Sequence, residues 1–108
     1  MSTLKAPRVR LPRAVRAGEA FEARLLMEHP METGLRQENG RAVPRDMLTS
    51  LVVTCDGATI FEATFRNGTA ANPFHVLHLR LDRTAELAFT WTDERGQTAR
   101  FAQRVTVA

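Results

Sequence analysis

The sequence is poor in cysteine: Cys55 is the single cysteine among 108 residues. One cysteine excludes an intrachain disulfide and also a structural zinc site built on two or four thiolates. The length fits one domain with a single hydrophobic core and is too short for two. We therefore predict one domain whose core is held together by packing alone.

Long apolar runs are also missing. No window reaches the roughly 18 consecutive apolar residues that a membrane-spanning helix needs, and Pro or Arg interrupts every short apolar run between Met1 and Arg16. We therefore expect no membrane insertion and no signal peptide. On this pattern alone the chain is typical of a cytoplasmic protein, and export of the folded chain on a partner's signal is the alternative.

Positive charge does not gather in blocks. The 15 basic residues face 12 acidic ones, the net charge is +3, and the two signs alternate along the chain. We expect no nucleic-acid partner, because binding a phosphate backbone requires a concentrated positive field. All basic residues except Lys5 are arginines, which suit paired contacts with carboxylates at interfaces. A functional basic face and an arginine-biased solvated surface are both compatible with this composition.

Motifs for catalysis are absent. The sequence has no glycine-rich phosphate loop, nucleotide fingerprint or paired-carboxylate arrangement. Cys55 shares its expected strand face with Leu51 and Val53, which indicates a small buried hydrophobe, and its reactivity is left to experiment. His75 and His78 are three residues apart and so point to opposite faces of a strand, where they cannot hold one metal ion. We predict no catalytic residue, no metal site and no cofactor.

Apolar residues instead alternate with polar ones along most of the chain, and no stretch of about a dozen residues shows the 3.6-residue period of a helix. The clearest strand covers residues 21–27, with apolar side chains at every second position. Asp56-Gly57 joins the strand patterns of residues 48–55 and 59–65 as a tight hairpin, because both residues tolerate a positive φ. Trp91 falls on an apolar strand face and is predicted to anchor the core.

The fold class follows from this spacing. About seven short strands with glycine-bearing turns predict an all-β protein, an immunoglobulin-like antiparallel β-sandwich. Residues 1–7 are assigned to an N-terminal tail and residues 8–108 to a single sandwich domain. The strand at residues 8–11 lies between two prolines, so we predict an edge strand whose arginines face water.

One segment, residues 28–46, departs from the alternation and is rich in Pro, Gly and charged residues. Loops of this length in compact domains are usually functional or disordered. We predict a functional, partner-binding loop, with a disordered insertion as the alternative. The candidate partner-binding residues are His29, Pro30, Met31, Glu32, Thr33, Gly34, Arg36, Pro44 and Arg45. Met31 is the apolar residue that we expect to pack back onto the sandwich.

The run His29-Pro30-Met31-Glu32-Thr33-Gly34, followed by Leu35-Arg36 and Pro44-Arg45, resembles the signature of the SoxZ family. The similarity covers nearly the whole chain through the segments Pro7 to Arg10, the strand that ends at Cys55, Asn72-Pro73-Phe74 and Phe89-Thr90-Trp91. Phe74 stands where the family often has tyrosine, so any contact made by that hydroxyl is lost here.

The resemblance implies a non-catalytic scaffold subunit of a heterodimeric sulfur-compound carrier. Its SoxY-like partner would carry sulfur intermediates on the cysteine of a Gly-rich arm, between oxidising enzymes of thiosulfate oxidation that dock transiently. The chain ends at Ala108 without such an arm, so the chemistry is expected to belong to the partner. The family implies a periplasmic location, reached by export together with the partner.

Three alternatives stay open. The chain could be a stand-alone immunoglobulin-like module that binds an acidic protein or sugar surface through its arginine-bearing edge strand. It could be a redox-active thiol protein that uses Cys55. A related carrier subunit that serves another pathway would have much the same sequence pattern.

Overall fold

The computed structural model describes residues 6–28, 35, 37–42, 47–65 and 74–108, and this part of the chain consists of strands, turns and connecting segments. The strands are β1 (Arg8–Arg10), β2 (Ala14–Val15), β3 (Phe21–Leu26), β4 (Gln37–Glu38), β5 (Arg41–Ala42), β6 (Leu48–Cys55), β7 (Ala58–Thr64), β8 (Phe74–Leu79), β9 (Ala85–Asp93) and β10 (Thr98–Val107). Within these residues no helix is long and apolar enough to cross a membrane.

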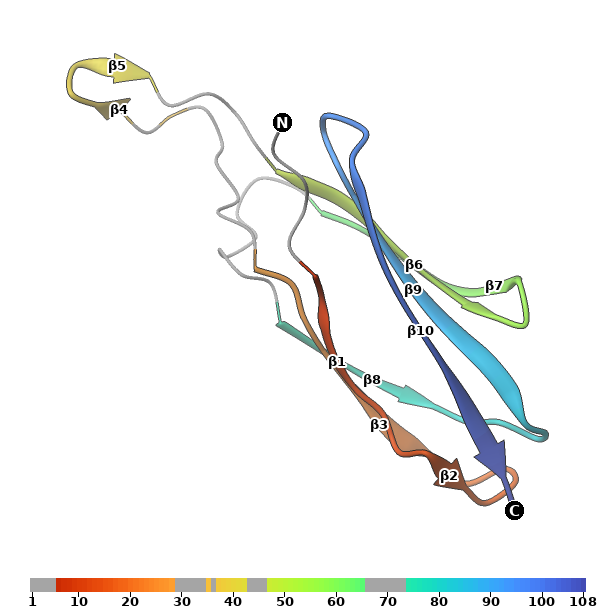
Figure 1. Ribbon diagram of the computed structural model, residues 1–108. Coiled ribbons are helices and arrows are strands. Elements are labelled where there is room, and N and C mark those ends of the chain that lie inside the picture. Colours follow the sequence, from red (N-terminus) through yellow and green to blue (C-terminus); the bar gives the residue numbers. More distant parts are fainter. Residues whose placement is uncertain (1–5, 29–34, 36, 43–46, 66–73) are drawn as a thin grey trace.

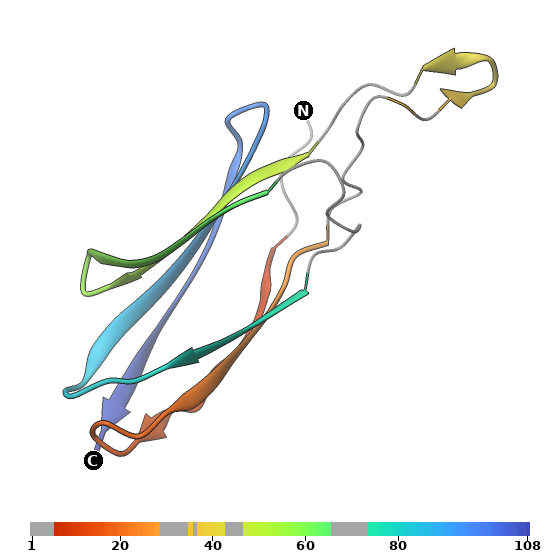
Figure 2. The same ribbon diagram turned by 180° about the vertical axis from the view of Figure 1, so that it is seen from behind.

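Two sheets pack face to face and make the body of the molecule (Figures 1 and 2). The smaller sheet has the strand order β1-β3-β8, and the larger has the order β2-β10-β9-β6-β7. Pairing is antiparallel except between β2 and β10, which run parallel. The prediction of an all-β, immunoglobulin-like sandwich is confirmed.

The core lies between the two sheets and is filled by every second residue of the longer strands. Its fully buried members include Ala23 and Leu25 of β3, Leu51 and Val53 of β6, Leu87, Phe89 and Trp91 of β9, and Val105 of β10. The Trp91 ring lies against Phe89, with 6.4 Å between the ring centroids. Trp91 is therefore the core anchor that the alternation predicts, and burying so large a ring stabilises the contact between the sheets.

The β6–β7 hairpin turns at Asp56 and Gly57, which have φ angles of 48° and 86°. The predicted pair of positive φ values is confirmed. The Asp56 backbone N–H donates to the carbonyl oxygen of Glu86 at 2.9 Å, and the Glu86 N–H donates to Asp56 Oδ1 at 2.8 Å. These two bonds fasten the turn to the start of β9.

The edges of the sandwich follow the predicted pattern in one place and differ in another. β1 is an edge strand, and its Arg8 and Arg10 are exposed as predicted. In the larger sheet, β7 is an edge strand. Its Phe61 is 36% exposed, although it lies opposite the buried Val53 in the register of β6 and β7. Ala63 and Phe65 on the same face pack against the core, but the edge position leaves Phe61 partly open to solvent.

Candidate partner-binding site

The predicted partner-binding residues all lie outside the described residues. They are His29, Pro30, Met31, Glu32, Thr33, Gly34, Arg36, Pro44 and Arg45. Their assignment, and the expected packing of Met31 onto the sandwich, stay predictions. The structure describes the residues on either side of the 28–46 segment and a hairpin within it.

Both ends of the segment are anchored in the sandwich by methionines. Met27 and Met47 are fully buried members of the core. The N-terminal end is further held by an ion pair of 3.3 Å between Glu28 Oε1 and Arg8. The carbonyl oxygen of Met47 accepts a 3.0 Å hydrogen bond from the Glu94 backbone, in the β9–β10 turn. The loop therefore starts and ends on rigid elements, which limits the entropy that ordering it costs.

Within the segment, β4 and β5 form a two-stranded ribbon that lies beyond one end of the sandwich (Figure 1). Its turn residues Asn39 and Gly40 have φ angles of 51° and 76°, as a tight two-residue hairpin requires. Leu35, just before β4, is 85% exposed. The Asn39-Gly40 pair is a strong hairpin signal that our sequence analysis missed.

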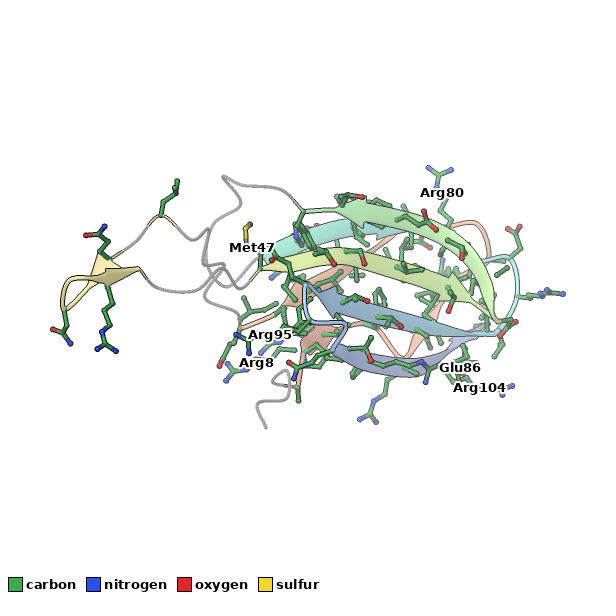
Figure 3. All side chains as sticks on the ribbon, turned by 90° about the horizontal axis from the view of Figure 1, so that it is seen from above. Arg8, Met47, Arg80, Glu86, Arg95 and Arg104 are labelled. Atoms are coloured by element: carbon green, nitrogen blue, oxygen red, sulfur yellow. The ribbon has the colours of Figure 1, made fainter. Side chains whose placement is uncertain are left out.

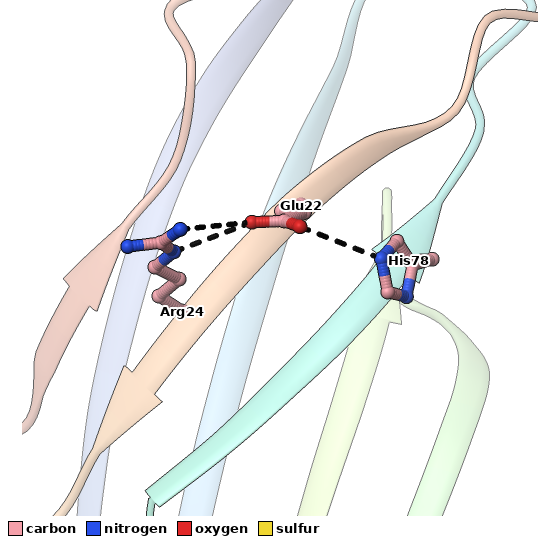
Figure 4. Close-up of polar contacts among 3 residues, drawn as sticks. All are labelled: Glu22, Arg24 and His78. Atoms are coloured by element: carbon pink, nitrogen blue, oxygen red, sulfur yellow. Dashed lines mark hydrogen bonds and ion pairs between the residues drawn. The ribbon is translucent and has the colours of Figure 1, made fainter.

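The outward face of the smaller sheet carries long charged side chains. Glu22 of β3 lies between Arg24 and His78, as Figure 4 shows. Arg24 donates through Nε to Glu22 Oε2 at 3.3 Å, and His78 Nε2 lies 3.6 Å from Glu22 Oε1. His78 is exposed on this face, whereas His75 faces the other way and is half-buried. The prediction that the two histidines point to opposite faces is confirmed.

A shallow hollow of about 280 Å³ on the same sheet is lined by Arg8, Arg10, Arg24 and Leu26. Arg10 and Arg24 are directly opposite each other across β1 and β3, an arrangement that places like charges side by side and is unfavourable by itself. Arg8 and Arg24 have carboxylate partners, and among the described residues Arg10 has no ion pair. The hollow could accept an acidic group.

Two titratable side chains pack against the core. Cys55 is half-buried, and burial raises the pKa of its thiol, with a further increase from Asp56 and an opposing effect of Arg83. The thiol is therefore protonated at neutral pH, which makes it a poor nucleophile. His75 stacks on Phe65 with 5.3 Å between the ring centroids, and burial lowers its pKa. Across the described ranges, no three His, Cys, Asp or Glu side chains are placed to hold a metal ion.

A family model described as sulphur oxidation protein SoxZ matches residues 9–104, which is nearly the whole chain and both of its sheets. The chain belongs to the SoxZ family. The suspected resemblance is thereby confirmed, and it places the protein in sulfur oxidation. No curated protein matches the chain.

Solved structures show the same fold at low sequence identity. The sulfur carrier protein SoxY from Chlorobium limicola f thiosulfatophilum matches with a TM-score of 0.66 and 12% identity, over 99% of this chain and 83% of that one. The superoxide reductase (neelaredoxin) from Ignicoccus hospitalis matches with a TM-score of 0.73 and 17% identity, over 97% and 82%. At these identities the matches establish a shared sandwich fold between this SoxZ-family chain and both proteins.

Proposed function

We propose that this chain is the non-catalytic subunit of a heterodimeric sulfur-compound carrier. Its partner is a SoxY-like subunit whose cysteine arm carries covalently bound sulfur intermediates between the oxidising enzymes of thiosulfate oxidation. The family match over residues 9–104 is the observation that carries this proposal. The raised pKa of the Cys55 thiol supports it, because a protonated, half-buried thiol is poorly suited to carry the sulfur itself.

The sandwich domain of residues 8–108 supplies the scaffold, and the 28–46 segment supplies the contact loop. Two buried methionines anchor that loop, so it presents its residues from a rigid base. Docking of enzymes must be reversible because the carrier leaves after each step. Modest, salt-sensitive docking and a larger, more apolar subunit interface fit that requirement. The heterodimer works in the periplasm and is exported together.

Affinity capture tests the pairing. The tagged chain is recovered from source cells grown on thiosulfate, washed at moderate salt, and analysed by mass spectrometry. We expect one stoichiometric small protein that ends in a Gly-rich tail with a cysteine. Recovery of the chain as a monomer without such a companion would remove the carrier function and leave the fold unchanged.

The loop arginines have a test of their own. We expect replacement of Arg36 and Arg45 by alanine to weaken docking of sulfur-oxidising enzymes more than pairing with the SoxY-like subunit. Both are measured as dissociation constants at two salt concentrations. Loss of pairing with unchanged docking of the remaining complex would show that these residues have the opposite role.

A second candidate function is supported by the arginine hollow. Arg8, Arg10 and Arg24 line it, and this arrangement favours a binding module for an acidic protein or sugar surface. Alkylation of the native chain separates both candidates from a redox-active thiol protein. Slow reaction of Cys55 with iodoacetamide at pH 7, and fast reaction after unfolding, are expected for a scaffold or a binding module; fast reaction in the native chain would favour thiol chemistry.

A further inference from the structure

The outward face of the larger sheet has an uncharged centre. Three cross-strand pairs join β6 to β9 there: Ser50 with Thr92, Val52 with Thr90, and Thr54 with Ala88. We call these six residues the threonine band. Val52, Thr54, Ala88 and Thr90 lie between neighbours that belong to the core or pack against it, and Ser50 and Thr92 each adjoin one core residue, so the band faces outward. All six side chains are short and none is charged.

Each of the three pairs continues onto the neighbouring strands as a row of residues that crosses the sheet. On β10, Thr98, Arg100 and Ala102 pair with Thr92, Thr90 and Ala88. On β7, Thr64, Glu62 and Thr59 pair with Ser50, Val52 and Thr54, and the bulge there adds Ile60, which is 47% exposed. Charge therefore appears at the margins of the rows, in Glu62 and Arg100.

One end of the band is bordered by further charge. The Arg100 guanidinium forms an ion pair with the Glu86 carboxylate at 3.5 Å. Glu86 lies directly opposite Arg104 in the register of β9 and β10. Glu86 and Arg104 lie close together at one end of the larger sheet in Figure 3, and Arg80 points away on the other side of the molecule. An uncharged centre with a charged rim is the pattern of protein–protein interfaces, whose cores are depleted of charged residues.

We propose that the threonine band binds the SoxY-like subunit, sheet against sheet. This inference rests on the proposed function and names the surface that pairing would use. The partner's chemistry is argued from its fold: the carrier protein SoxY shares this sandwich, so it also has a broad sheet face to offer. Stacked sheets lie about 10 Å apart, a separation that short side chains allow and long charged ones prevent.

Ala88 is the least exposed residue of the band. Its side chain is a single methyl group, and it is 4% exposed although it lies on the outward side of β9. Four strands and three rows cover roughly 400 Å² at ordinary strand and residue spacings, about half of the ~800 Å² that each partner contributes to a stable interface. The remainder must come from residues outside the band.

A matched pair of substitutions tests the proposal. Val52→Arg places a long charge in the centre of the band, and Val76→Arg makes the same change on β8, where Val76 is 41% exposed on the outward face of the smaller sheet. Full-length variants are titrated calorimetrically with the purified SoxY-like subunit of the same source. We expect Val52→Arg to raise the dissociation constant roughly 30-fold or more, the size of an interface hot spot, and Val76→Arg to change it less than about threefold.

Folding is checked by thermal unfolding of each variant, and Thr90→Arg replaces Val52→Arg if the latter does not fold. Equal binding by the band variant and the wild type, or an equal loss with Val76→Arg, would overturn the proposed surface while the pairing itself stands. No binding by the wild-type chain would instead remove the proposed function, and this inference with it. A wild-type chain that sediments alone as a dimer, and becomes monomeric with Val52→Arg, would assign the band to a second copy and overturn the partner named here.

Discussion

The two sheets contribute similarly to the core and differ on their outward faces. Leu25 of the smaller sheet and Trp91 of the larger are both fully buried. Outside, the smaller sheet carries Glu22 in contact with both Arg24 and His78, whereas the centre of the larger sheet is the uncharged threonine band. Both sheets therefore place large apolar side chains in the core. Their roles differ through the side chains on their outward faces.

The largest effects should come from the interior, where we expect the two sheets to be equivalent. Trp91→Ala should lower the free energy of unfolding by about 3–5 kcal/mol and Leu25→Ala by about 2–5 kcal/mol, because each leaves a cavity in a close-packed core. Urea unfolding followed by circular dichroism measures both. A negligible loss for one of them would mean that its sheet does not share the common core.

A smaller effect is expected at the turn that ties β6 and β7 to β9. Asp56→Ala should cost about 1–2 kcal/mol, since it removes the acceptor of the 2.8 Å bond from Glu86 and a residue that tolerates positive φ. Asp82→Ala, at an exposed aspartate, serves as the control and should change the free energy of unfolding by less than about 0.5 kcal/mol. Equal effects of the two substitutions would show that the tie to β9 contributes nothing.

The pH dependence of stability should report the burial of His75 on the inward face of β8. Burial lowers the pKa of His75, so the unfolded state binds more protons between that lowered pKa and about 6.5. Stability is then complete above about pH 6.5 and decreases as pH falls through this window. His75→Gln should reduce the decrease in melting temperature on acidification, because it removes the group that takes up a proton on unfolding. A decrease as large as that of the wild type would contradict the assignment of His75 to the buried face.

The smallest effects are expected for the exposed ion pairs of both outward faces. Arg24→Ala on the smaller sheet and Arg100→Ala on the larger should each change the free energy of unfolding by less than about 1 kcal/mol, because exposed pairs are screened by water. Urea midpoints of both variants test this. A loss of several kcal/mol at either site would mean that the ion pairs hold the fold rather than border a binding surface.

Much of the fold could be predicted from residue order. The period-two alternation predicts β3, β6, β9 and β10, and Asp56-Gly57 predicts the hairpin because its φ requirement is local. β2 could not be predicted, because a two-residue strand has no measurable period and forms through its parallel pairing with β10. The exposure of Phe61 could not be predicted from the sequence either, because it depends on β7 lying at an edge of the sheet.

The candidate site also has features that the sequence predicts and features that it does not. The linear run from His29 to Arg36 suffices to suggest the family, and the family match confirms it. The β4–β5 hairpin had a signal in Asn39-Gly40 but strands too short to be recognised by alternation. The buried methionines on either side of the loop were not assigned as its anchors, because their burial depends on contacts with distant strands.

The sequence by itself determined which residues face inward, where the tight turns occur and to which family the chain belongs. Each of these depends on residues that are close together in the sequence. Only the tertiary structure decided which strands are neighbours. The threonine band combines positions 50–54 with positions 88–92, and its rows continue onto β7 and β10. Its register is set by the buried side chains of the opposite face, since a slip of one residue would turn every core residue outward.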